Sequence, residues 1–129
     1  FIARAYKENS AVRSAIEGKR NLQGFFTAYL SICNYYLVAP EMELNHGFCD
    51  LFLMADLTHY AVAHSYIIEL KYAKYKDPED RVKELRKEGI AQANRYADTD
   101  TVQNAVGSTQ LHKIVVVYKG MEMRVCEEI

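Results

Sequence analysis

The spacing of apolar residues predicts two helices in the first third of the chain. Over residues 1–19, apolar side chains recur loosely at helical spacing among Arg and Lys, which predicts a first helix. Residues 22–36 are apolar nearly all round, and Asn21 is a suitable N-cap before them. A helix without a polar face packs between other elements, so we expect this second helix to be buried.

Over residues 36–56 the apolar residues recur at every second position, which predicts β-structure. Asn45, His46 and Gly47 interrupt this stretch with residues typical of a turn, so it should form a hairpin of two strands. A further run of β-branched and aromatic residues, 61–75, predicts a third strand.

A helical period returns over residues 79–97, where acidic residues in the first turn suit the positive end of the helix dipole. A polar segment, 98–110, follows without a predicted element. Residues 111–120 then form a continuous apolar run with the length of a buried strand, and residues 121–126 could add a last strand.

The predicted elements follow the order α-α-β-β-β-α-β, with an optional final β. This order indicates the α/β class, with a mixed central β-sheet flanked by helices. The helix between the third and fourth strands is a crossover, which makes those two strands parallel neighbours. The length of 129 residues fits a single domain, 1–129, and no internal repeat divides it.

Composition limits the compartment and the partners. Cys33, Cys49 and Cys126 are widely spaced, which argues against a disulfide framework or a zinc site and favours a reducing compartment. No apolar run reaches the length of a membrane span and no signal segment opens the chain, so we expect a cytoplasmic protein without a membrane partner. The chain starts at Phe1 rather than Met, which suggests a fragment of a longer protein.

Two predicted strands carry ionisable side chains among apolar ones. Glu69 and Lys71 share one face of the third strand, because side chains two residues apart point the same way. Asp50 lies on the preceding strand, with Phe48 and Phe52 expected on its own face. Burying such groups is costly unless they pair or bind an ion. If the two strands are antiparallel neighbours, Asp50 and Glu69 come within reach of one cation, and their oxygens suit Mg²⁺ or Mn²⁺.

The motif formed by these residues is G-x-x-D, a spacer of 18 residues, then E-x-K on the following strand. It resembles the PD-(D/E)XK nuclease superfamily, and the element order is similar too. The resemblance implies a restriction-endonuclease-like core that hydrolyses phosphodiester bonds of nucleic acid. It also implies that Asp50 and Glu69 hold the metal and that Lys71 positions or activates the attacking water. Gln92, on the next helix, matches a Gln that the family often sends toward the site.

A narrower resemblance covers roughly residues 22–120. The segments I-I-E-L-K-Y-A-K and Q-A-N-R-Y-A, the second of which contains Gln92 and Tyr96, are similar to those of a nuclease-like domain that ends many bacterial proteins with an AAA-ATPase-like module. This resemblance implies that such a module lies in the same full-length chain. For Gln92 and Tyr96, ordinary packing and a hydrogen bond remain an equal alternative to a role in the site.

One acidic position of the family is not matched directly. The resemblance implies a Glu on the helix before the hairpin, but residues 22–35 contain no acid. Glu17 lies upstream of that helix, and Glu43 lies on the first strand beside the hairpin. We expect Glu43 to be the third metal ligand. Cys49 also replaces the Pro that often precedes the first Asp.

The charge distribution allows nucleic acid to bind only at a local patch. The formal net charge is −1, so no overall positive field attracts a polyanion. Residues 71–95 carry eight basic and five acidic side chains, a local charge of +3, which could contact a DNA backbone independently of its sequence. The acids stand at pairing distance on the helix, so a solvated face is an equally good interpretation.

Three hypotheses follow. The first is an Mg²⁺- or Mn²⁺-dependent nuclease that acts on nucleic acid, with DNA favoured; a homodimer could complete its groove because one small domain covers little duplex. The second is a catalytically degenerate binding or regulatory module beside an ATPase, which the missing helical Glu and the low net charge favour. The third is an assembly domain that uses a Tyr-rich face. The four His residues have no metal-ligand spacing, so we expect turn, loop or sheet-surface roles for them.

Overall fold

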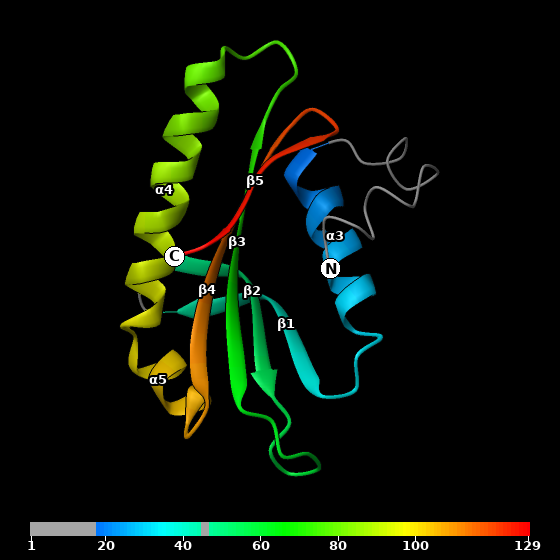
Figure 1. Cartoon of the computed structure of the whole chain (residues 1–129), viewed down its shortest axis with the longest axis vertical. Coiled ribbons are helices and arrows are strands. Elements are labelled where there is room, and N and C mark those ends of the chain that lie inside the picture. Colours follow the sequence, from blue (N-terminus) through cyan, green and yellow to red (C-terminus); the bar gives the residue numbers. More distant parts are fainter. Residues whose placement is uncertain (1–17, 45–46) are drawn as a thin grey trace.

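The computed structural model describes residues 18–44 and 47–129, and for 41–44 and 47–48 it describes the backbone alone. This part of the chain is an α/β domain in which helices cover both faces of one five-stranded sheet (Figure 1). Its elements are α3 (Gly18–Leu30), β1 (Tyr36–Leu44), β2 (Gly47–Ala55), β3 (His64–Ala73), α4 (Glu79–Ala97), α5 (Asp100–Val106), β4 (Gln110–Lys119) and β5 (Glu122–Glu128).

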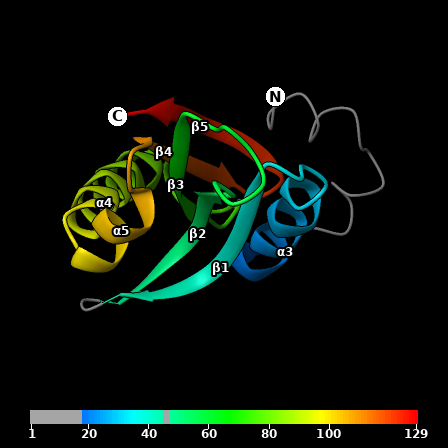
Figure 2. The ribbon, with the colours of Figure 1, turned by 90° about the horizontal axis from the view of Figure 1, so that it is seen from below.

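The sheet is mixed, and its strands lie in sequence order, β1-β2-β3-β4-β5. Strands β1 and β2 form the predicted antiparallel hairpin, and β2 pairs antiparallel with β3. The crossover through α4 makes β3 and β4 parallel neighbours, which confirms the prediction, and β5 adds an antiparallel edge. Seen from below, the β1–β2 hairpin extends away from the other strands (Figure 2).

Alternation along β3 divides the core between the two faces of the sheet. Ile68 and Leu70 belong to a cluster with Leu22 and Phe26 of α3. Ile67, on the other face, packs in a cluster with residues of α4 and α5. Figure 1 shows the result, with α3 on one side of the sheet and α4 and α5 on the other. By the same alternation, Glu69 and Lys71 lie on the face that α4 covers.

Helix α3 differs from the predicted buried helix in its bounds and in its exposure. It begins at Gly18 rather than at residue 22, and it ends at Leu30 rather than at residue 36. Gly24 and Ala28 are exposed, so the helix covers one face of the sheet and is not enclosed. The apolar residues near 36 pair with β2 instead, because strand pairing overrides a helical pattern in a short apolar run. The helix predicted over 1–19 lies outside the described residues up to Glu17.

The predicted element order is wrong at α5, since the described order is α-β-β-β-α-α-β-β. Helix α5 occupies the polar segment that was expected to hold no element. Thr99 caps it, its hydroxyl accepting a hydrogen bond from the Val102 amide at 3.4 Å, and Gly107, at φ 55°, ends it. The helix has seven residues and buries only Val102 and Val106, which is too few for a visible helical period. The predicted helix at residues 79–97 and the optional last strand are both confirmed.

No helix among the described residues is long and apolar enough to cross a membrane.

Candidate functional site

Strands β2 and β3 separate at the candidate site. Their register covers only Leu51–Leu53 opposite Tyr66–Ile68. At the next position, side chains replace the backbone ladder: the Asp50 amide donates to Glu69 Oε1 at 3.4 Å, and the Leu70 amide donates to Asp50 Oδ2 at 2.9 Å. Each carboxylate thus accepts a hydrogen bond from a backbone amide of the neighbouring strand, which fixes both side chains where the two strands separate.

Both carboxylates are buried. Asp50 is 7% exposed and Glu69 is 1% exposed. Burial, and next the charge of Asp50, raise the pKa of Glu69 to about 8, although the nearby Lys71 ammonium lowers it. Such a pKa means that burial first, and the neighbouring Asp50 charge second, disfavour the ionised form of Glu69. This is the electrostatic condition that an additional cation relieves.

Lys71 lies beside Glu69 and is held from helix α4. Its Nζ is 3.5 Å from Glu69 Oε2 and also donates a hydrogen bond to Gln92 Oε1. The approach of α4 depends on Gly89, where an added Cβ would lie 2.7 Å from Val115 Cγ1 and 3.6 Å from Lys71 Cγ. The structure therefore brings Gln92 to the predicted site, one helical turn from the residue that permits close packing.

Helix α3 adds two side chains that the sequence did not predict for the site. Lys19 Nζ forms an ion pair with Asp50 Oδ1 at 2.7 Å, and Gln23 Nε2 donates to the Asp50 carbonyl at 2.8 Å. The two residues are one turn apart and face the sheet together. A signal for Gln23 was present, since a buried amide within an apolar helix needs a hydrogen-bond partner. Lys19 was predicted at the end of a separate first helix, 1–19, so its place on the face of α3 that meets the sheet could not be assigned.

Tyr96 has a packing position. Its ring belongs to the core cluster that contains Cys49 and Phe52, and the Arg95 guanidinium lies 5.6 Å from the ring centroid. Burial, and then the charge of Glu69, raise the pKa of its hydroxyl. The Tyr96 hydroxyl is thus close enough for the charge of Glu69 to change its pKa, but the side chain packs as a core residue. Cys49 and Phe52 share this cluster although they are three residues apart, so strict alternation fails around Asp50.

The third predicted metal ligand lies outside the side chains that the structure describes. The backbone of Glu43 pairs with Phe48 in the hairpin, and no side-chain position is described for it. Glu17, the other acid near the helix, lies outside the described residues. Within residues 18–44 and 47–129, as far as side chains are described, no three His, Cys, Asp or Glu side chains converge on one point. His64 and His112 form a pair on neighbouring strands, 2.8 Å between Nδ1 and Nε2.

The described residues fit a divalent cation in donor chemistry. Asp50 and Glu69 offer carboxylate oxygens, the donors that Mg²⁺ and Mn²⁺ prefer. Burial, and next the charge of Asp50, raise the pKa of Glu69 even with Lys71 beside it, and a bound cation would favour its charged form. The ion pair between Lys19 and Asp50 shows that one oxygen already attracts a cationic partner from the protein.

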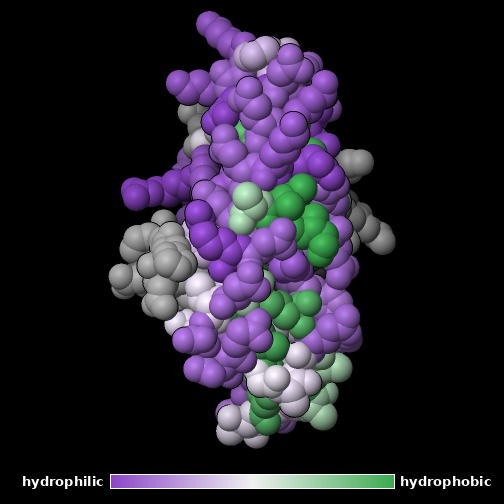
Figure 3. Space-filling view, turned by 90° about the vertical axis from the view of Figure 1, so that its left-hand side faces the viewer, coloured by the Kyte–Doolittle hydropathy of each residue, from purple (hydrophilic) through white to green (hydrophobic). Residues whose placement is uncertain are grey.

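The predicted basic patch is partly neutralised by acidic side chains, some within residues 71–95 and some on β3 and β5. Among the eight basic side chains of residues 71–95, four form ion pairs: Lys71 with Glu69, Arg81 with Glu84 and Glu88, Lys83 with Asp80, and Arg86 with Glu127. Figure 3, which looks onto the side that carries α4, shows a surface covered mostly by hydrophilic residues. Part of this surface is therefore the solvated face that the sequence left as an alternative.

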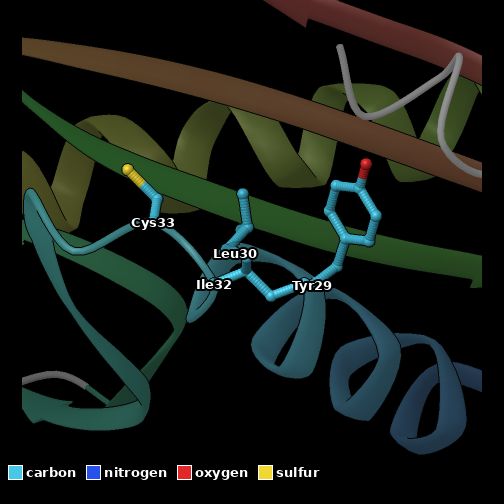
Figure 4. A pocket seen from close by; sticks show the side chains of 4 residues that line it. All are labelled: Tyr29, Leu30, Ile32 and Cys33. Atoms are coloured by element: carbon cyan, nitrogen blue, oxygen red, sulfur yellow. The ribbon is translucent and has the colours of Figure 1, made fainter.

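A small cavity of about 180 Å³ lies away from the carboxylates, at the end of α3 opposite Lys19. Tyr29, Leu30, Ile32 and Cys33 line it (Figure 4). Its surface is largely apolar, so it offers little to hold a charged ligand.

Comparison with known proteins agrees with the geometry. No curated protein and no solved structure is significantly similar to this chain. A family profile described as the PD-(D/E)XK nuclease superfamily matches residues 17–128, nearly the whole sequence. The chain therefore belongs to the PD-(D/E)XK nuclease superfamily.

Proposed function

We propose that this domain catalyses metal-dependent hydrolysis of phosphodiester bonds in nucleic acid, with DNA as the favoured substrate. Membership of the superfamily implies nucleic acid as the substrate class. The observation that carries the proposal is the pair of buried carboxylates, Asp50 and Glu69, held at the separation of β2 and β3 with Lys71 beside them. Such a group of ionisable side chains is too costly to bury for packing alone.

Each residue of the group has a proposed role. Asp50 and Glu69 would hold Mg²⁺ or Mn²⁺, with Glu43 as a third ligand. The bound cation would neutralise charge that develops on the phosphate and would make water more acidic. Lys71 would position the attacking water through its ammonium group. Gln92 would fix that ammonium group through the hydrogen bond to its Oε1.

The test is cleavage of a mixture of DNA and RNA substrates with Mg²⁺ or Mn²⁺. We expect Asp50→Ala and Lys71→Ala each to lower the rate by at least about a hundredfold, as loss of a group that acts in the transition state does. Lys83→Ala is the matched control, because the Lys83 side chain is 77% exposed on α4, and its rate should stay unchanged. Activity that survives both site variants would show that the residues are assigned wrongly.

A second candidate is a catalytically degenerate binding or regulatory module. The observation that favours it is that each carboxylate already has an ammonium partner, Lys19 for Asp50 and Lys71 for Glu69. Calorimetric titration with Mn²⁺ separates the two candidates. If wild type binds Mn²⁺ and Glu69→Ala does not, the result supports the enzyme. If the folded wild-type protein binds no Mn²⁺, the result supports the binding or regulatory module.

We also propose that the domain works beside an ATPase-like module in a longer bacterial protein, and that two copies pair to complete a groove for duplex DNA. The first proposal rests on the likeness of the segments around Glu69 and Gln92. The second rests on the small size of the domain. Analytical ultracentrifugation of the chain with and without a duplex measures the pairing, and a complex with one copy per duplex would refute it.

A further inference from the structure

Among the described side chains that contact Asp50 or Glu69, that of Lys19 is part-exposed and has no role in the proposed mechanism. We propose that Lys19 is a built-in counter-ion of Asp50 that gives up this place when a divalent cation binds, and that it then contacts a phosphate of the nucleic acid. The inference rests on the proposed function, because it requires that Asp50 is a metal ligand.

The geometry separates a fixed carboxylate from a movable ammonium group. Lys19 Nζ lies 2.7 Å from Asp50 Oδ1, but the Lys19 side chain is 42% exposed, whereas that of Asp50 is 9% exposed. Lysine has a long flexible stem with a compact charge at its end, so a part-exposed lysine can swing into solvent at little cost. The pair can therefore open without unpacking the core.

The position of Lys19 in helix α3 is unfavourable apart from this ion pair. It stands in the first turn, where the helix dipole disfavours positive charge, and that turn contains no acidic residue. Arg20 adds a second cation beside it. The only described partner that offsets this arrangement is Asp50, which lies on β2 rather than on the helix.

Charge balance explains why a bound cation would release Lys19. Asp50 and Glu69 face two ammonium groups, those of Lys19 and Lys71. A divalent ion on the carboxylates would leave positive charge in excess and would repel both lysines. Lys71 is 8% exposed and is held by Gln92, so it stays in place. Lys19 is the cation that can move.

The backbone need not move during this exchange. Gln23 holds the Asp50 carbonyl, and the Asp50 carboxylate keeps its hydrogen bond from the Leu70 amide through Oδ2 rather than Oδ1. Only the oxygen that faces Lys19 changes its partner. Once released, Lys19 lies on the solvent side of the site and can pair with a phosphate group of the nucleic acid that binds at the metal.

The experiment compares wild type with Lys19→Met and with a matched control, Arg20→Met, which removes the same charge from an exposed neighbour on the same helix. Calorimetry measures Mn²⁺ affinity, and fluorescence anisotropy measures binding of a short DNA duplex in EDTA and in Ca²⁺. Lys19→Met should bind Mn²⁺ about two- to fivefold more tightly, the effect expected when a part-exposed competing ion pair is lost. Arg20→Met should match wild type.

Lys19→Met should bind DNA more weakly than wild type, whereas it binds Mn²⁺ more tightly, and the DNA effect should appear only when metal is present. In EDTA, Lys19→Met and wild type should bind the duplex equally, because Asp50 holds Lys19. In Ca²⁺, the variant should bind more weakly, and the slope of log affinity against log salt should be shallower by about one. A lysine that only supports the fold would not give these opposite effects.

The outcomes are distinguishable. If wild type and Lys19→Met bind Mn²⁺ equally, the counter-ion exchange is wrong while the proposed function stands. If neither binds Mn²⁺, the proposed function fails, and the exchange fails with it. If Lys19→Met unfolds, Lys19→Gln replaces it, since the amide can still donate to Asp50 without a charge; the same tightening supports the exchange, and an unchanged affinity overturns it.

Discussion

Glu69 combines the deepest burial at the site with the strongest electrostatic conflict. It is 1% exposed, and its pKa in the folded protein is about 8, against an ordinary value of 4.5. The folded state therefore binds a proton at Glu69 between these two values, while the unfolded state has lost it. This proton stabilises the fold fully below pH 4.5, and the stabilisation is lost as pH rises to about 8.

A neutral side chain at this position should remove the pH dependence. In EDTA, we expect Glu69→Gln to gain stability relative to wild type by on the order of 1 to 3 kcal/mol as pH rises from 5 to 9. Urea unfolding at both pH values measures the difference. Glu122→Gln, at a residue whose side chain is 73% exposed, is the control and should show no such gain. A constant difference between Glu69→Gln and wild type would mean that Glu69 is ionised in the fold at both pH values.

Gln92 allows the hydrogen bond to Lys71 to be tested apart from packing. Gln92→Met keeps the volume of the side chain but removes the acceptor oxygen that fixes the Lys71 ammonium group. We expect cleavage to slow about tenfold, because a loosely placed group loses part of its effective concentration. Mn²⁺ affinity should stay unchanged, since Gln92 is not a proposed ligand. An unchanged rate would leave Gln92 with a packing role only.

At the residue scale, the sequence was informative where geometry is local. The two-residue period placed Glu69 with Lys71, and the hairpin pattern brought Asp50 to the neighbouring strand. The ion pair of Lys19 with Asp50 could not be predicted, because it depends on how helix α3 docks onto the sheet. Alternation also fails around Asp50, where the strands part and side chains replace backbone partners.

At the scale of elements, the distance between α4 and the sheet decides where Gln92 stands. Val115 is completely buried and branched at Cβ, so it cannot turn away from a larger residue at position 89. Gly89→Ala should therefore destabilise the domain by about 1–3 kcal/mol, despite the better helix propensity of Ala. It should also slow cleavage, because α4 would move away from Lys71.

Gly24 provides the matched control for this prediction. It lies inside α3, is exposed, and an added Cβ there would have no atom within 4 Å. Gly24→Ala should stabilise the domain by roughly 0.5–1 kcal/mol, the difference in helix propensity. Thermal unfolding of both variants checks the pair. Equal shifts at the two positions would show that packing against Val115 does not limit α4.

The elements that were predicted well are those whose pattern is long. Helix α4 has 19 residues and several turns of apolar period, and the sequence placed both of its ends correctly. Helix α5 has seven residues, and its capping by Thr99 is visible only once its position is known. The limits of α3 depend on where β1 begins to pair with β2, which is a tertiary property.

At the scale of the whole molecule, charge limits how nucleic acid binds. The net charge is −1, and half of the eight basic side chains of residues 71–95 have acidic partners. In EDTA, we expect duplex DNA affinity to fall with salt at a log–log slope no steeper than about −4, which corresponds to about four phosphate contacts. Anisotropy titrations between about 50 and 200 mM salt measure this slope. A much steeper slope would require a basic surface elsewhere on the chain.

The links that assemble the site also affect when it forms during folding. The hydrogen bonds from Gln23 to Asp50, from Asp50 to Glu69 and from Lys71 to Gln92 join residues that are 27, 19 and 21 positions apart in the chain. Loops of this length must close before any of these bonds can form, and helices from opposite faces of the sheet must both have docked. A collapsed intermediate that lacks either helix would hold an incomplete group of charges. The site should therefore form only after α3 and α4 have both docked, and we expect Mn²⁺ uptake during refolding to follow the docking of the second of these helices.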